Sequence, residues 1–314
     1  MNLIIKKLPI PIAGLMLALA AIGNLLSSYS NFYKSLFGIL SSVIMLLLLI
    51  KVISMPKSLN EGFNHPVIAS VIPTFSMGLM ILSTYVKPYF PSLAYYLWLI
   101  GLILHVFLIL YFTKKYIFTF QIKKVFPSYF IVYVGIVSAS VTAPAFNLTS
   151  LGQYIFWFGF VAYLILLPFV LYRVFAVKQI PEAAIPTITI FAAPASLCLA
   201  GYLKSFPDKN IFMISFLSIL SLIMFISVML YMPKMLKLKF YPSYSAFTFP
   251  FVITAIAMKG TYAFLLNTKG IIPHLGNFVK FLELWSIVMV IFVFIKYMLF
   301  IVDIPHSISG TTQK

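Results

Sequence analysis

Charged side chains are scarce in this sequence. They make up 9% of the 314 residues, whereas 62% are hydrophobic, and the mean hydropathy is +1.08. A soluble domain of this length has too little interior to hide so much apolar surface. Runs of about twenty apolar residues are what a membrane-spanning helix needs. The composition therefore predicts an integral membrane protein.

Acidic residues and cysteine are the rarest of the reactive groups. The chain has five Asp and Glu in total, four His and one Cys, Cys198, which cannot form an intrachain disulfide. Proton-coupled transport usually needs an ionisable group deep in a span, and enzymes need paired acids, a nucleophile with its base, or a metal cluster. We find none of these sets, and no His has a Cys or carboxylate at metal-ligand spacing. The sequence predicts no metal, no cofactor and no enzymatic activity.

The net charge of +17 suggests nucleic-acid binding at first, but the positions of the basic residues argue against it. Fourteen Lys and Arg lie in the N-terminus, the C-terminus and the loops from even to odd spans, and five lie on the other side. This asymmetry is the positive-inside bias of membrane proteins. We expect a multi-pass protein of the cell membrane, with both termini cytoplasmic and no nucleic-acid partner.

Five prolines recur at nearly even intervals of about sixty residues, which is enough for two membrane-crossing helices and their turns. They are Pro9, Pro66, Pro127, Pro186 and Pro242. Hydropathy predicts ten spans, at 9–29, 32–53, 66–86, 91–112, 127–146, 151–173, 183–204, 209–233, 243–267 and 276–302. We therefore expect a single membrane domain over 1–314, built from hairpin repeats at 9–53, 66–112, 127–173, 183–233 and 243–302.

Odd and even spans differ in the size of their side chains. Odd spans carry small residues at helical spacing, such as Gly135, Ala139 and Ala143, which let helices approach closely in lipid, whereas even spans are bulky. We expect an all-α fold of ten transmembrane helices in a quasi-five-fold arrangement, with an inner ring of odd helices around a central pore. Helix-bending prolines are expected within three inner helices, at Pro73, Pro194 and Pro250.

Two charged residues within the ninth and tenth spans need an explanation. Lys259 lies about 24 Å along its helix from residue 243, near the outer surface, where it is either an anion-attracting group or a snorkelling lysine. Glu283 has Lys280 three residues before it, so the two can neutralise each other on one helix face. His105, in the fourth span, is expected to have a packing or interfacial role.

Several segments together carry a resemblance to a known family. They are LPIPIAGLMLALAAIGNL, HPVIASVIPTFSMGLM, FPSYFIVYVGIVSAS, LPFVLYRVF, IPTITIFAAPASLCLAGYL and FYPSYSAFTFPFVITAIAM. In layout and in these motifs the whole chain resembles the tellurite-resistance/dicarboxylate-transporter family, which includes bacterial TehA and the slow anion channels of plant guard cells.

The resemblance implies five hairpins around a pore, a homotrimer with one conduit per subunit, and a phenylalanine on the ninth helix that plugs the pore. The motif Ala246-Phe247-Thr248-Phe249 places that gate at Phe249, followed by Pro250 where TehA has glycine. Repeat symmetry nominates pore-lining residues at the same depth, namely Met16, Ile72, Val134 and Ala193.

The favoured hypothesis is a passive channel for small inorganic or carboxylate anions, closed at rest by Phe249. Hydroxyls and small residues with no fixed charge would bind anions weakly. Weak binding favours rapid passive flow of anions over transport that is coupled to a second solute. The alternative is a secondary transporter of C4-dicarboxylates such as malate, or of sulfite- or tellurite-type oxyanions.

Overall fold

The structure, a computed structural model, describes residues 2–270 and 273–302. Within these ranges the chain forms α, 3-10 and π helices and no strand. Three residues counted above, Asp303, His306 and Lys314, lie outside the described residues. The expectation of an all-α membrane protein is therefore confirmed at the level of its secondary structure and its apolar helices.

The odd-numbered segments are each broken into two or three helical pieces, whereas each even-numbered segment is one long helix, which in two cases ends in a π turn. The odd segments comprise η1 (Ile10–Ile12) with α2 (Ala13–Leu26), α5 (Pro66–Val71) with α6 (Thr74–Val86), α8 (Tyr129–Tyr133) with α9 (Val137–Thr142) and η4 (Ala143–Phe146), η6 (Glu182–Ala192) with α11 (Ala193–Ser205), and η7 (Pro242–Phe247) with α13 (Phe249–Lys269). The even segments are α3 (Asn31–Ser54), α7 (Pro91–Phe112) with η2 (Thr113–Ile117), α10 (Thr149–Leu171) with η5 (Tyr172–Val177), α12 (Ile211–Met235) and α14 (Leu275–Val302).

Eight of these segments are long and apolar enough to cross a membrane, and Ile10–Leu26 and Val137–Phe146 are shorter apolar segments. Burial separates the two kinds. In the odd-numbered segments Pro66–Val86 and Glu182–Ser205, 83% of the most apolar stretch of 18 residues is buried. In the even-numbered segment Ile211–Met235 the buried share is 28%. Because the exposed side chains of the long helices are large and apolar, those helices offer the face that lipid prefers.

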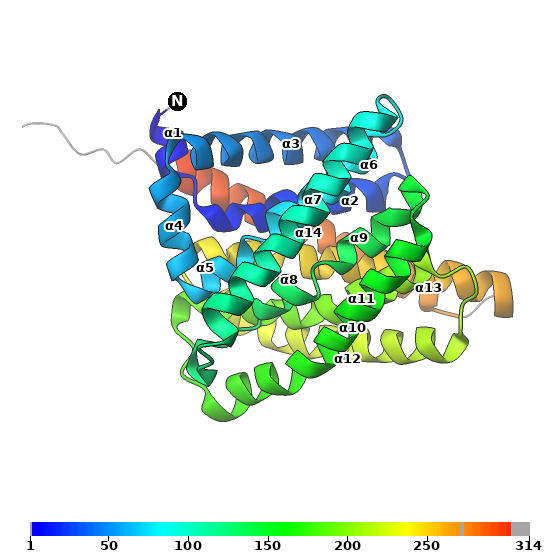
Figure 1. The fold of residues 1–314 in the computed structure, drawn as a ribbon. Coiled ribbons are helices and arrows are strands. Elements are labelled where there is room, and N and C mark those ends of the chain that lie inside the picture. The colour runs from blue at the N-terminus through cyan, green and yellow to red at the C-terminus, as the bar shows by residue number, and fades with distance from the viewer. Residues whose placement is uncertain (1, 271–272, 303–314) are drawn as a thin grey trace, which may run out of the picture.

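The odd-numbered segments contact one another in a closed order through their main helices. Helix α2 packs on α6, α6 on α9, α9 on α11, α11 on α13, and α13 returns to α2. Each of them also packs against the long helix that follows it in the chain. Figure 1 shows the long helices α3, α7, α10 and α12 around these buried pieces.

The prolines lie where helical pieces begin. Pro73 is the residue before α6, and Pro194 and Pro250 lie in the first turns of α11 and α13. A proline there removes an N–H that has no partner within the helix anyway. From the sequence we expected bends within continuous helices; the structure instead has a change of helical piece at each of these prolines. The fifth segment breaks at 134–136 without any proline.

Two features of the connections were not expected. The loop at 54–65 contains a helix, α4 (Pro56–Asn64), which runs between α3 and α5 at the end of the molecule that carries α1 (Asn2–Lys7) (Figure 1). Helix α7 ends in the π turn η2, whose Tyr116 hydroxyl donates to Phe63 O at 2.7 Å and whose Lys115 Nζ donates to Asn64 Oδ1 at 2.6 Å. These bonds fix α4 across that end.

Candidate functional site

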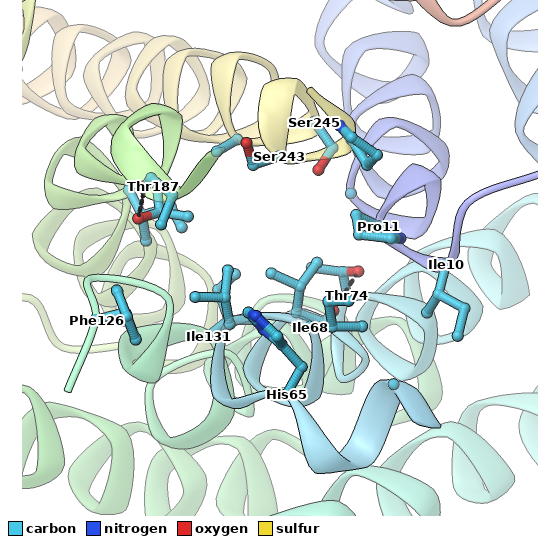
Figure 2. Close-up of a pocket in the computed structure, with 18 of the residues that line it drawn as sticks. Ile10, Pro11, His65, Ile68, Thr74, Phe126, Ile131, Thr187, Ser243 and Ser245 are labelled. Atoms are coloured by element: carbon cyan, nitrogen blue, oxygen red, sulfur yellow. Dashed lines mark hydrogen bonds between the residues drawn. The ribbon is translucent and has the colours of Figure 1, made fainter. Parts of the chain in front are cut away.

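A cavity of about 800 Å³ opens among the five odd-numbered segments, and every one of them lines it. Figure 2 shows the order around the cavity. Ile10 and Pro11 come from the first segment, and Ile68 and Thr74 from the third. Phe126 and Ile131 come from the fifth, Thr187 from the seventh, and Ser243 and Ser245 from the ninth. The cavity therefore lies inside the ring of contacts described above.

The rim of the cavity is basic. Of the described residues that line it, five are lysines and one, Glu61, is an acid, and the lysines are Lys6, Lys7, Lys51, Lys123 and Lys124. They belong to the N-terminus, to the end of α3 and to the loop before the fifth segment, all on the side that the charge asymmetry predicts to be cytoplasmic. Such a rim raises the local concentration of anions.

Lys51 also connects α3 to the N-terminal helix α1 at this rim. Its side chain is buried, with 5% of the residue exposed, and its ammonium donates to Ile5 O at 3.0 Å and Lys6 O at 3.1 Å. These carbonyls lie at the C-terminal end of α1, where a cation is favoured by the helix dipole. Lys51 thus anchors the N-terminal helix beside the cavity mouth.

Arg173, on η5, fastens two rim loops. Its guanidinium donates from Nε to Lys123 O at 3.2 Å, from Nη1 to Lys178 O and from Nη2 to Gln179 O at 3.4 Å. The guanidinium also lies over the Phe126 ring, 5.6 Å from its centroid. Since Lys123 and Phe126 line the cavity, Arg173 supports the rim from behind.

Beyond the rim the described lining carries no Asp, Glu, Lys or Arg; its polar groups include the hydroxyls of Thr74, Thr187, Ser243 and Ser245. Thr74 donates to Val71 O at 2.7 Å and Thr187 to Ala184 O at 2.6 Å, so both hydroxyl protons are engaged with the backbone. The interior therefore offers few donors to an anion and no fixed counter-charge.

The cavity ends partway along each segment. The last lining residues in chain order are Leu17, Met77, Gly135, Leu197 and Pro250. Phe249 lies at this inner end; it lines the cavity and is 7% exposed. Phe249 is the first residue of α13, directly after Thr248, whose hydroxyl donates to Ser245 O at 2.6 Å. The aromatic ring is thus carried at a junction between helical pieces.

Three of the five residues nominated for the pore, Phe249, Val134 and Ala193, are among the lining residues. Met16 and Ile72 are not; their neighbours Leu17 and Val71 line the cavity instead. A change of one residue in the alignment of two helices turns the side chain by about 100°. The breaks between helical pieces do not fall at equivalent positions in the first, third and ninth segments, so the residue that faces the cavity differs from the one nominated. Of the three nominated prolines, Pro194 and Pro250 line the cavity and Pro73 does not.

Lys259 lies away from the cavity. Its Nζ forms an ion pair with Glu283 Oε1 at 2.6 Å and donates to Ser28 Oγ at 2.7 Å. The expected pairing of Glu283 with Lys280 is wrong, because the acid points from α14 toward α13. The Tyr29 hydroxyl donates to the other carboxylate oxygen, Glu283 Oε2, at 2.6 Å.

For His105 the sequence predicted a packing or interfacial role, and the structure places it in the packed interior. It is fully buried on α7 and bonds both Ser76 and Val132, on the third and fifth segments. Among the described residues, no three or more His, Cys, Asp or Glu side chains are grouped so as to hold a metal ion. What the site presents is a cavity with a basic rim and an uncharged interior.

Comparison with known proteins agrees with this geometry. The family model described as voltage-dependent anion channel matches residues 7–304. A Methanocaldococcus jannaschii protein named an uncharacterized transporter is 28% identical over 254 residues, which cover 71% of this chain and 72% of that one. The resemblance inferred from the motifs is thereby confirmed. The chain is an all-helical membrane protein and belongs to the voltage-dependent anion channel family, whose members are channels and transporters of anions.

Proposed function

We propose that this protein is a passive anion channel that is closed by Phe249. The observation that carries the proposal is the cavity, which all five inner segments line and which ends at the level of Phe249. Its basic rim would gather anions, and its uncharged interior would bind them weakly enough to let them leave. Movement of one aromatic ring would then connect the cavity to the far side.

The proposal includes a membrane layout. The chain would cross the membrane ten times as five hairpins with both termini in the cytoplasm, so that the cavity opens to the cytoplasm. The closed order of contacts from α2 to α13 supports an inner ring with quasi-five-fold symmetry. A homotrimer in the cell membrane, with one conduit per subunit, is what the family resemblance implies. Lys259 would face the outer mouth, with its charge shared with Glu283.

The runner-up is a secondary transporter of malate or another C4-dicarboxylate, or of sulfite- or tellurite-type oxyanions. The name of the Methanocaldococcus relative, a transporter, favours it. Such a carrier would need alternating access and a saturable flux. The uncharged interior supports the channel instead, because a doubly charged anion would lose its hydration there without gaining a counter-charge.

The test is transport by the purified protein in liposomes. Efflux of chloride, nitrate, sulfite and malate would be measured for the wild type and for Phe249→Ala. A channel gated by Phe249 predicts low flux in the wild type and a higher, non-saturating flux in the variant. Flux that saturates, or that requires a second solute in fixed ratio on the opposite side, would favour the carrier and refute the channel.

A further inference from the structure

His105 stands behind the cavity wall, between two inner segments. It lies on α7, is 0% exposed and does not itself line the cavity. Its Nδ1 lies 2.8 Å from Ser76 Oγ on the third segment, and its Nε2 lies 3.1 Å from Val132 O on the fifth. A single imidazole ring therefore bridges two neighbouring members of the inner ring.

The chemistry of these partners fixes which nitrogen carries the proton. The Val132 carbonyl can only accept, so Nε2 is the donor. In the neutral imidazole Nδ1 is then an acceptor, so the Ser76 hydroxyl, which also donates to Pro73 O, shares its single proton between the two. The Ser76 hydroxyl also lies 2.8 Å from Pro73 O, which already accepts from Met77 N at 3.1 Å. The bridge is thus complete without a charged group.

Each end of the bridge lies at a break in a segment. Val132 is near the end of α8, just before the break at 134–136. Around that break Gly135 N bonds Phe130 O at 3.2 Å and Val137 N bonds Val134 O at 3.0 Å, so the usual helical ladder is interrupted. A carbonyl that leaves the ladder inside a membrane has no water to bond and needs a protein partner. His105 supplies that partner.

The other end lies beside the proline break of the third segment. Ser76 is three residues after Pro73, in the first turn of α6. The next residue, Met77, lines the inner end of the cavity, as does Gly135. A Cβ placed on Gly135 would lie 2.7 Å from Met77 Sδ and 3.1 Å from His105 Cε1. The His105 ring and Met77 therefore leave no free space for a side chain at Gly135.

We propose that His105 is a positioning residue of the anion pathway. It ties the breaks of the third and fifth segments together and so sets the width of the cavity at Met77 and Gly135. Without the bond to His105, the Val132 carbonyl would accept the helical hydrogen bond from the N–H of residue 136. The fifth segment would then straighten, and the cavity wall at Gly135 would move. The tie follows from the hydrogen bonds alone; its effect on anions rests on the function proposed above.

The first experiment measures chloride efflux from liposomes in a Phe249→Ala background, where the proposed gate is absent. His105→Phe keeps a flat ring and removes both hydrogen bonds, whereas His105→Gln keeps one donor and one acceptor. His105→Phe is expected to lower efflux about tenfold, the rate change produced when a hydrogen bond of ordinary strength enters the barrier. His105→Gln is expected to recover most of the loss. Ser286→Ala, which removes a bond within α14, is the control and should leave efflux unchanged.

The second experiment does not depend on transport. Hydrogen–deuterium exchange of the 129–142 peptide should rise in His105→Phe and stay near the wild-type level in His105→Gln. If His105→Phe does not fold, Ser76→Ala replaces it. This variant removes the Nδ1 bond and the Ser76 bond to Pro73 O but keeps the Nε2 bond to Val132, so a smaller rise in exchange is expected. Unchanged exchange in the 129–142 peptide would overturn the tie.

Chloride efflux that is equal in His105→Phe and its parent would overturn the effect on the pathway. Absence of anion flux from every variant, Phe249→Ala included, would refute the proposed function, and exchange would then decide the role of His105.

Discussion

Lys259 of α13 and Glu283 of α14 form an ion pair with an Nζ–Oε1 distance of 2.6 Å, and the pair joins the helix that begins with Phe249 to the last described helix. The carboxylate side chain is 6% exposed and the ammonium side chain 32%. Because the partners come from different helices, the pair holds tertiary structure. The pair also means that Lys259 does not present a full unit of positive charge to an anion.

Glu283→Gln should lower stability, because it leaves the Lys259 ammonium without its counter-ion in a partly buried position. The expected loss is about 1–3 kcal/mol, in the range for removing one partner of a charged hydrogen bond. Thermal unfolding in detergent measures it. Lys280→Gln is the matched control on the same helix, and its unfolding temperature should equal that of the wild type. A larger effect at Lys280 would instead restore the pairing expected from the sequence.

Gly135→Ala should be destabilising by about 1–3 kcal/mol, the usual cost of overpacking. Its Cβ would lie 2.1 Å from Ile131 O and 2.7 Å from Met77 Sδ, and a carbonyl cannot move aside as a flexible side chain can. Gly260→Ala provides the comparison, because its Cβ would meet only Leu203 Cδ1, at 3.0 Å. Thermal unfolding of both variants checks the difference. Equal unfolding temperatures would show that the break at 134–136 can relax.

Lys178 is the clearest case of backbone strain. Its φ of 55° and ψ of −148° lie in a region that non-glycine residues rarely adopt. Arg173 bonds its carbonyl and so holds this conformation at the rim. Lys178→Gly should stabilise the protein by about 1 kcal/mol, because glycine adopts these angles without steric cost.

Lys178→Ala is the control for the strain prediction, since it removes the charge and keeps the Cβ. Its unfolding temperature should not rise. If both variants unfold at the same temperature, the side chain rather than the backbone angle determines the effect.

The sequence predicted the membrane class, the all-helical secondary structure and the family, and the sizes of its side chains distinguished buried from exposed segments. Small residues such as Ala139 and Ala200 are buried, and bulky ones such as Leu230 are exposed, because close helix contact and lipid contact select opposite side-chain sizes. These properties are local and therefore readable along the chain.

Other features depend on which segments meet, and a single sequence does not contain that information in readable form. The partner of Glu283 lies 24 residues away on another helix, whereas spacing along one helix suggested Lys280. The fifth segment breaks without a proline, and the carbonyl at that break is bonded by His105 from 27 residues away. Leu17 rather than Met16 lines the cavity because α2 begins only at Ala13, after the 3-10 turn at Ile10–Ile12.

The most direct measurement of the central claim is the current through a planar bilayer that contains the Phe249→Ala protein in a chloride gradient. Phe247→Ala is the matched control, because Phe247 is also buried and lies two residues away, but packs on Tyr244 and does not line the cavity. We predict that Phe249→Ala gives discrete openings that reverse near the chloride equilibrium potential, while the wild type and Phe247→Ala remain nearly silent. A silent Phe249→Ala protein, or equal currents in all three, would contradict the assignment of Phe249 as the gate.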